Sequence, residues 1–146
     1  MEMQRRSLIL LDLLQERKEK IIVPTVMVSE LLLGVEPKFH GDYIAELQRR
    51  FFCPPYDLRA AALAAELWLY HRGLPKEEQV QRSVLRADVM IIATAKVSGA
   101  TEFYSHDGKC RKLATKAGMT ALDLPLNHPN MFRDAEIRCD LNLEPE

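Results

Sequence analysis

Three carboxylates stand at comparable places in the chain and could do metal chemistry together. Glu30 follows the β-branched run 21–24 and lies early in an expected helix, and Asp88 lies in the first part of a later helix. Asp107 comes directly after the short apolar segment 101–105. A carboxylate in mostly apolar surroundings needs a cation or hydrogen bonds. Mg²⁺ or Mn²⁺ suits such a set, because hard cations prefer oxygen ligands and can activate water beside a phosphate.

Each acid also has a purely structural explanation. Glu30 fits a solvated helix surface, Asp88 fits a first-turn partner of the helix dipole, and Asp107 with Gly108 fits an ordinary turn. For any one residue the structural explanation is favoured. The coincidence of three acids at three similar positions favours a shared site.

The elements that would position these acids alternate between strands and helices. Helices are expected where apolar residues recur at helical spacing, and the clearest begins at Asp57 as N-cap and ends at Gly73. The expected helices are 7–20, 25–34, 41–52, 57–73, 84–99 and 109–118, and the expected strands are 21–24, 101–105 and 119–125. This order predicts an α/β architecture with a parallel sheet, whose sites form beyond the carboxyl ends of strands.

Composition limits the class of protein. The chain has 146 residues, 47% of them hydrophobic, which is enough for one domain with a real core. A net charge of −1 argues against non-specific coating of nucleic acid. Three distant cysteines fit neither a disulfide scaffold nor a metal knuckle. No run is long enough to span a bilayer and the N-terminal patch is too short for a signal peptide, so we expect a soluble, cytoplasmic protein.

Two stretches, IIVPTVMVSELLLG and RADVMIIATAKVSGATEFYSHD, resemble the PIN-domain nucleases, especially the VapC-like toxins of toxin–antitoxin modules. In that family a strand and Pro-Thr lead into a helix with a glutamate, matched by Glu30. A later aspartate opens an Ala-Thr-Ala helix, matched by Asp88, and a strand ends in a Thr/Ser-x-Asp turn, matched by Ser105 and Asp107. The resemblance runs from about residue 8 to residue 125.

The resemblance implies a three-layer α/β/α fold with a mainly parallel central sheet over residues 1–125, followed by a tail at 126–146. It implies a metal-dependent endoribonuclease in which Glu30, Asp88 and Asp107 hold Mg²⁺ or Mn²⁺ and an activated water attacks an RNA phosphodiester. Ser105 would orient a ligand or phosphate. Arg86 either pairs with a carboxylate or phosphate or belongs to a solvated helix face. The partners implied are RNA, an antitoxin covering the site, and a second copy in a homodimer.

Two departures from the family leave a second function open. The family's first metal ligand is an aspartate at the end of an opening strand, but here only Asp12 is available, and a crossover through residues 13–20 is too short for a parallel strand pair. We therefore expect Asp12 on a helix and the first strand to be missing. No acid follows Asp107 either. The alternative is a catalytically impaired PIN-like module that binds RNA or protein; a phosphatase or other phosphotransfer enzyme ranks last. Trp68 is expected in the core.

Overall fold

The computed structural model describes residues 2–127. They divide into two compact units. Residues 2–19 and 124–127 belong to the first unit, and Lys20–Asp123 form the second. The predicted division into 1–125 and a tail at 126–146 stays a prediction, because residues 128–146 lie outside the described part of the chain.

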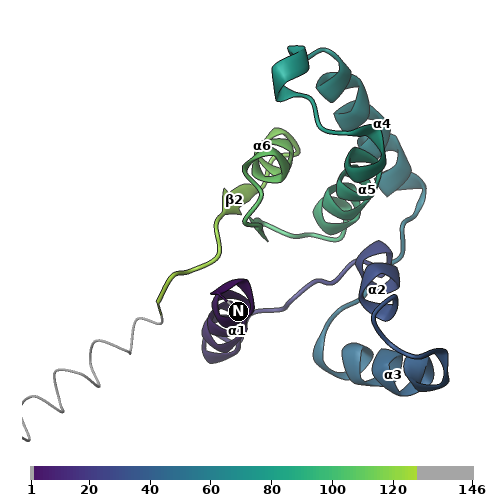
Figure 1. The fold of residues 1–146 in the computed structure, drawn as a ribbon, viewed down its shortest axis with the longest axis vertical. Helices are drawn as coiled ribbons and strands as arrows, with labels where there is room; N and C mark the ends of the chain where they lie inside the picture. Colours follow the sequence, from purple (N-terminus) through teal and green to yellow (C-terminus); the bar gives the residue numbers. More distant parts are fainter. Residues whose placement is uncertain (1, 128–146) are drawn as a thin grey trace, which may run out of the picture. The chain divides into compact units, whose positions relative to one another are not determined.

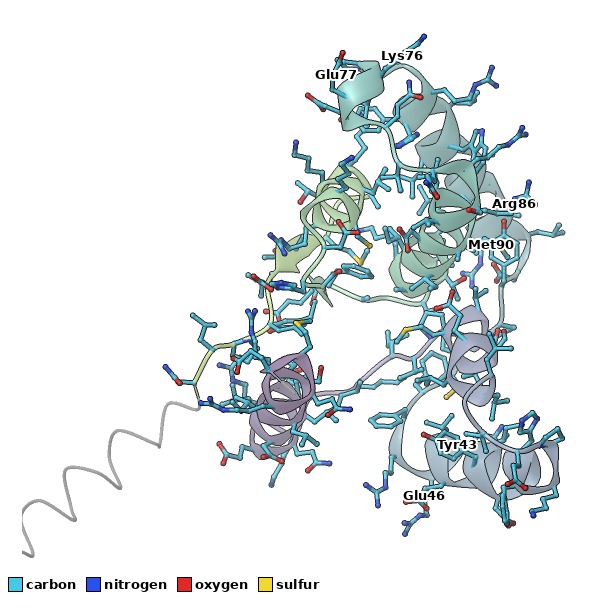
Figure 2. All side chains as sticks on the ribbon, in the orientation of Figure 1. Tyr43, Glu46, Lys76, Glu77, Arg86 and Met90 are labelled. Atoms are coloured by element: carbon cyan, nitrogen blue, oxygen red, sulfur yellow. The ribbon has the colours of Figure 1, made fainter. Side chains whose placement is uncertain are left out.

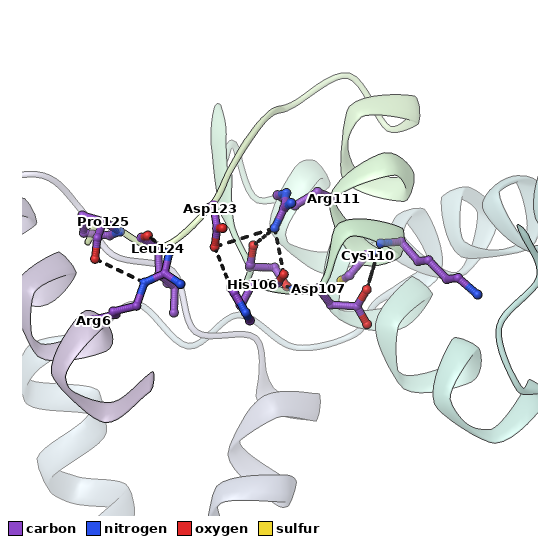
Figure 3. A network of polar contacts seen from close by, with 10 residues as sticks. Arg6, His106, Asp107, Cys110, Arg111, Asp123, Leu124 and Pro125 are labelled. Carbon is purple, nitrogen blue, oxygen red and sulfur yellow. Dashed lines mark hydrogen bonds and ion pairs between the residues drawn. The ribbon is translucent and has the colours of Figure 1, made fainter. Parts of the chain in front are cut away.

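The first unit is a helix bound to a short extended segment. Helix α1 (Glu2–Glu16) buries Arg6 and Ile9. The Arg6 guanidinium donates to the backbone oxygens of Leu124 and Pro125, the latter at 3.4 Å (Figure 3). A buried guanidinium needs such acceptors, so these carbonyls fix the segment on α1. Asp12 lies on this helix with an exposed side chain, as predicted.

The second unit holds five helices and two short strands among its described elements (Figure 1). They are α2 (Thr25–Leu32), α3 (His40–Arg50), α4 (Leu58–Arg72), α5 (Arg82–Val97), β1 (Glu102–Tyr104), α6 (Gly108–Lys116) and β2 (Thr120–Leu122), with 3-10 turns at Pro37–Phe39 and Lys76–Glu78. Every predicted helix is present within a few residues of its expected bounds. The strand predicted at 21–24 is wrong in extent, because this run forms only one isolated parallel bridge, between Ile22 and Phe52.

The two strands pair in parallel and are connected by α6. Glu102 lies opposite Thr120, and Tyr104 lies opposite Leu122. Gly118, with φ at +89°, allows the sharp return from α6 into β2, since a side chain there would be strained. This β1–α6–β2 unit confirms the predicted α/β class with parallel pairing. It also places Asp107 just beyond the carboxyl end of β1, at the start of α6.

The core lies mainly between α4 and α5, which pack side by side (Figure 1). Small alanines on α4 allow close approach to the apolar face of α5, where Ile92 is completely buried. Burying a side chain of this size contributes roughly 1.5–3 kcal/mol to folding. Thr94 is also fully buried, and its hydroxyl donates to the Met90 carbonyl at 2.7 Å, so the polar atom is satisfied. Asp57 caps α4 as predicted, accepting from the Ala60 N–H at 2.9 Å.

Between residues 2 and 127, none of the helices combines the length and the apolar character that crossing a bilayer requires.

Candidate active site

Asp107 is held in place as the N-cap of α6. Its Oδ1 accepts hydrogen bonds from the backbone N–H of Lys109 at 2.8 Å and of Cys110 at 3.4 Å. The exposed N–H groups of a helix start favour a carboxylate there, both as hydrogen-bond donors and through the helix dipole. Asp107 therefore has a structural role as an N-cap, which differs from the ordinary turn expected of Asp107 and Gly108, because Gly108 is the first residue of α6. This role does not exclude chemistry, because capping fixes the position of a carboxylate that remains exposed to solvent.

Asp88 is the most perturbed acid of the site. It lies half-buried on α5. Burial, followed by the negative charges of Asp107 and Glu30, raises the pKa of its carboxyl from 3.8 to about 6. The three predicted residues therefore act on one another electrostatically. At neutral pH they form a concentration of negative charge that a bound cation would relieve.

Glu30 reaches this cluster from α2. Helix α2 contacts α5, and α5 contacts α6, so the packing of three helices brings together residues that are far apart in the sequence. The Glu30 side chain is exposed. It is thus accessible to a cation or to a phosphate-bearing ligand approaching from solvent.

The donor set fits a hard divalent cation in chemistry, since all three side chains offer carboxylate oxygens. Their arrangement is looser than a preformed metal cage. Within residues 2–127, no three His, Cys, Asp or Glu side chains lie close enough to hold one ion jointly. Mg²⁺ commonly keeps several of its waters in proteins and is bound through only one or two carboxylates. The site therefore suits an ion that the three acids share partly through water.

Ser105 shapes the turn that presents Asp107. Its hydroxyl oxygen accepts from the Asp107 backbone N–H at 3.2 Å, and its carbonyl accepts from Arg111 Nη1 at 2.7 Å. These contacts orient the backbone on the N-terminal side of the capping aspartate. The predicted role of Ser105 toward a metal ligand or phosphate stays a prediction.

Arg86 lies on an exposed part of α5 near the acids in sequence. It precedes Asp88 by two residues, an offset that places two side chains on different faces of a helix. Figure 2 shows Arg86 and Met90, one turn apart, projecting from the same side of α5. This position suits contact with an approaching ligand better than pairing with Asp88, and the functional role of Arg86 stays a prediction.

Two features of the site were not predicted from the sequence. Cys110 is buried beside the acids, and burial, followed by the charge of Asp88, raises its thiol pKa to about 12. The thiol therefore stays protonated and adds no charge to the cluster. Its only signal in the sequence is its position three residues after Asp107, which puts it in the first turn of α6.

The second feature is a network that fixes the 105–107 turn (Figure 3). Arg111 Nη1 donates to the carbonyl of His106 at 2.9 Å and lies 3.7 Å from Asp123 Oδ1. His106 Nδ1 lies 3.0 Å from the same carboxylate oxygen. Arg111 therefore binds the turn that carries Asp107.

Comparison with known proteins identifies the family. The family model described as PIN domain matches residues 3–116, well over half of the chain. A search of curated proteins finds no match. PIN domains are generally nucleases and typically use divalent metal ions. The match covers the helices that carry Glu30 and Asp88 and the turn that carries Asp107. The chain belongs to the PIN domain family.

Proposed function

We propose that this protein is a metal-dependent endoribonuclease that hydrolyses RNA phosphodiesters. The observation that carries the proposal is that two acids act electrostatically on a third, half-buried one. Burial and the charges of Asp107 and Glu30 raise the pKa of Asp88 to about 6. Active sites are where such perturbed carboxylates concentrate. Family membership supports a nuclease reaction at this cluster.

In the proposed mechanism, Mg²⁺ or Mn²⁺ supplies an activated water and stabilises charge on the phosphate. Asp88, the half-buried carboxylate of the three, would be the main ligand of the cation. Asp107 and Glu30 are both exposed and would complete the binding of the cation, and Asp107 is held in place by the α6 N-terminus. Ser105 keeps the Asp107 turn in place, and Arg86 offers a cation to the RNA backbone.

We further propose that the protein is the toxin of a toxin–antitoxin pair and acts in the cytoplasm. The support is the resemblance of its motifs to VapC-like toxins. An antitoxin would inhibit it by laying an acidic or apolar segment over the three acids and their surroundings. A homodimer is part of the same proposal, and the exposed apolar side chains of Leu33 and Phe39 are compatible with such contacts.

The test is RNA cleavage with a matched pair of variants. Purified protein with Mn²⁺ is expected to cleave single-stranded RNA, and EDTA is expected to stop cleavage. Asp88→Asn removes the central carboxylate and is expected to reduce cleavage at least a hundredfold. Asp12→Asn changes an exposed aspartate of α1 and should leave cleavage unchanged. Equal cleavage by Asp88→Asn and the wild-type protein would overturn the assignment.

A binding-only module is the second candidate function. It is favoured by one observation: among the residues that the structure describes, no three potential ligands lie close enough together to hold a metal. Calorimetry with Mn²⁺ separates the two functions. One ion bound per chain, lost in Asp88→Asn, supports the nuclease. RNA binding in EDTA that is insensitive to Asp88→Asn, together with no uptake of Mn²⁺, supports the binding module.

A further inference from the structure

A pocket of about 300 Å³ lies at the end of α4, and none of the three acids is among its lining residues. Its walls come from the last turns of α4, from the loop that follows, and from the first turn of α5. Trp68, His71, Arg72, Val80, Arg82 and Leu85 are among its lining residues. A volume of 300 Å³ is at the lower end for small-molecule sites and suits a single planar group with its substituents.

The pocket is preformed, because side chains of its own walls hold the loop. His71 is buried, and its Nε2 accepts from the Val80 backbone N–H at 2.9 Å. The Gln79 side-chain amide donates to the Leu74 carbonyl at 2.9 Å. Burial, followed by the charge of Lys109, lowers the pKa of His71. The imidazole is therefore neutral at neutral pH and remains an acceptor for Val80.

The pocket combines an aromatic ring with positive charge. The Arg82 guanidinium lies 5.6 Å from the centre of the Trp68 ring, a cation–π distance. Arg72 is exposed at the rim, and Lys109 Nζ donates to the Gln79 carbonyl at 3.3 Å. Two arginines therefore line the pocket with a half-buried indole, and a lysine binds the backbone of the pocket loop, in a chain whose net charge is −1. Among the acids of the adjoining turn, Glu77 projects outward from its tip (Figure 2).

Two residues connect this pocket to the acidic cluster. Leu85, in the pocket wall, precedes Asp88 by three residues, which puts both on the same side of α5 about 4.5 Å apart along the axis. Lys109, which contacts the Gln79 carbonyl of the pocket loop, follows Asp107 by two residues. The pocket is thus a neighbour of the proposed catalytic carboxylates within the same unit.

We propose that this pocket binds one unpaired nucleotide of the RNA, next to the phosphodiester that is cleaved. The base takes the place of the Arg82 guanidinium over the Trp68 indole, and the adjoining phosphate lies against Arg82 and Arg72. Aromatic platforms beside arginines are the usual means of holding unpaired bases, and every base offers a stacking face. Guanidinium groups bind phosphate oxygens through paired hydrogen bonds. The proposal deepens the proposed ribonuclease function and rests on it for the identity of the strand.

Trp68 is the only tryptophan in the sequence, so fluorescence excited at the long-wavelength edge, where the four tyrosines do not absorb, reports on this pocket alone. The wild-type protein is titrated in EDTA, where cleavage is stopped, with a single-stranded RNA decamer, with an abasic decamer and with 5′-AMP. The decamer is expected to quench Trp68 emission and to bind at least fivefold more tightly than the abasic strand. Weaker quenching by 5′-AMP is expected, since it offers one base and one phosphate. Equal binding of both strands without quenching would overturn the proposal.

Variants separate stacking from general charge attraction, with binding followed by the anisotropy of a labelled decamer. Trp68→Leu keeps an apolar group against the core and is expected to weaken binding by about five- to a hundredfold. Arg82→Gln changes an exposed side chain and is expected to weaken binding at least threefold even if Trp68→Leu fails to fold. Arg59→Gln, about 20 Å from Arg72 along α4, is the matched control and should change binding by less than twofold.

If Arg82→Gln weakens decamer binding no more than Arg59→Gln does, the proposed nucleotide site is overturned. Binding of an acidic peptide as tight as that of the decamer would overturn it as well. The outcome is distinguishable from failure of the proposed function. Base-dependent quenching in a protein that never cleaves RNA with Mn²⁺ supports the pocket and contradicts the nuclease. Cleavage abolished by Asp88→Asn without any quenching supports the nuclease and contradicts the pocket.

Discussion

Replacing Asp88 by asparagine is expected to make the metal-free protein more stable while it removes activity. The wild-type carboxyl has a pKa of about 6 in the folded chain and 3.8 as its reference value. A folded pKa above the unfolded one means that the native state holds its proton more tightly. Stability is therefore complete below the unfolded value and is lost as the pH rises through the folded value. Asparagine mimics the protonated carboxyl and avoids this loss.

The expected gain in the free energy of unfolding follows from the pKa shift of Asp88. A difference of about 2 pKa units corresponds to roughly 3 kcal/mol at pH 7.5, at about 1.36 kcal/mol per unit. The carboxyl is only half-buried, so solvent screening reduces the measurable gain to about 1–3 kcal/mol. At pH 4 the same relation gives Asp88→Asn a gain of less than about 1 kcal/mol over the wild-type protein, because the native carboxyl is then protonated and the unfolded one is only partly ionised.

Urea unfolding in EDTA measures the gain in the free energy of unfolding at pH 7.5 and at pH 4. The dependence of this free energy on urea concentration should have the same slope in both proteins. Asp12→Asn, on the exposed surface of α1, is the control and should change the free energy of unfolding by less than about 0.5 kcal/mol at either pH. If Asp88→Asn is no more stable than the wild-type protein at pH 7.5, burial and the charges of Asp107 and Glu30 do not raise the pKa of Asp88 as the structure indicates.

Three further predictions concern the core and the buried titratable groups. Ile92→Ala, at a fully buried position, is expected to lower the free energy of unfolding by about 2–5 kcal/mol, measured by urea denaturation; a loss below about 1 kcal/mol would contradict the described core. Because the pKa of His71 is lowered by burial, stability should be complete above pH 6.5 and fall as the pH drops below it; His71→Gln should flatten this part of a pH–stability curve, and an unchanged curve would exclude a buried neutral imidazole. Cys110, buried with its pKa raised to about 12, should resist iodoacetamide at pH 8 until urea is added, as read by peptide mass mapping; rapid labelling of the native chain would refute its burial.

Local sequence patterns were sufficient to locate the helices and both described strands. Asp57 and the alanines that follow it determine α4 through capping and intrinsic preference, which are properties of neighbouring residues. The same holds for the placement of Asp12 on a helix, where leucine spacing and a short crossover both opposed a strand. The run at 21–24 could not be resolved in this way. Its one bridge depends on Phe52, a partner some thirty residues away in the sequence.

The sequence singles out the acids of the candidate site but not the contacts that hold each of them. The order of Glu30, Asp88 and Asp107 could be read along the chain, and the structure adds that burial, followed by the charges of Asp107 and Glu30, raises the pKa of Asp88. Their joint role in a metal site stays a prediction. The capping bonds of Asp107 and the burial of Cys110 depend on how α6 packs, which no short motif reports. Trp68 was expected in the core, and it does pack against it, but the stacking of Arg82 on its ring appears only once α4 and α5 are side by side.

The central claim is that Glu30, Asp88 and Asp107 hold one divalent ion between them. Anomalous diffraction from crystals grown with Mn²⁺ tests it most directly, because the scattering peak locates the ion independently of the protein. The account predicts one strong peak within direct coordination distance of an Asp88 oxygen, with the carboxylates of Glu30 and Asp107 bound directly or through one water. Absence of a peak at this cluster in Mn²⁺-saturated crystals, or a strong peak bound only by other residues, would contradict it.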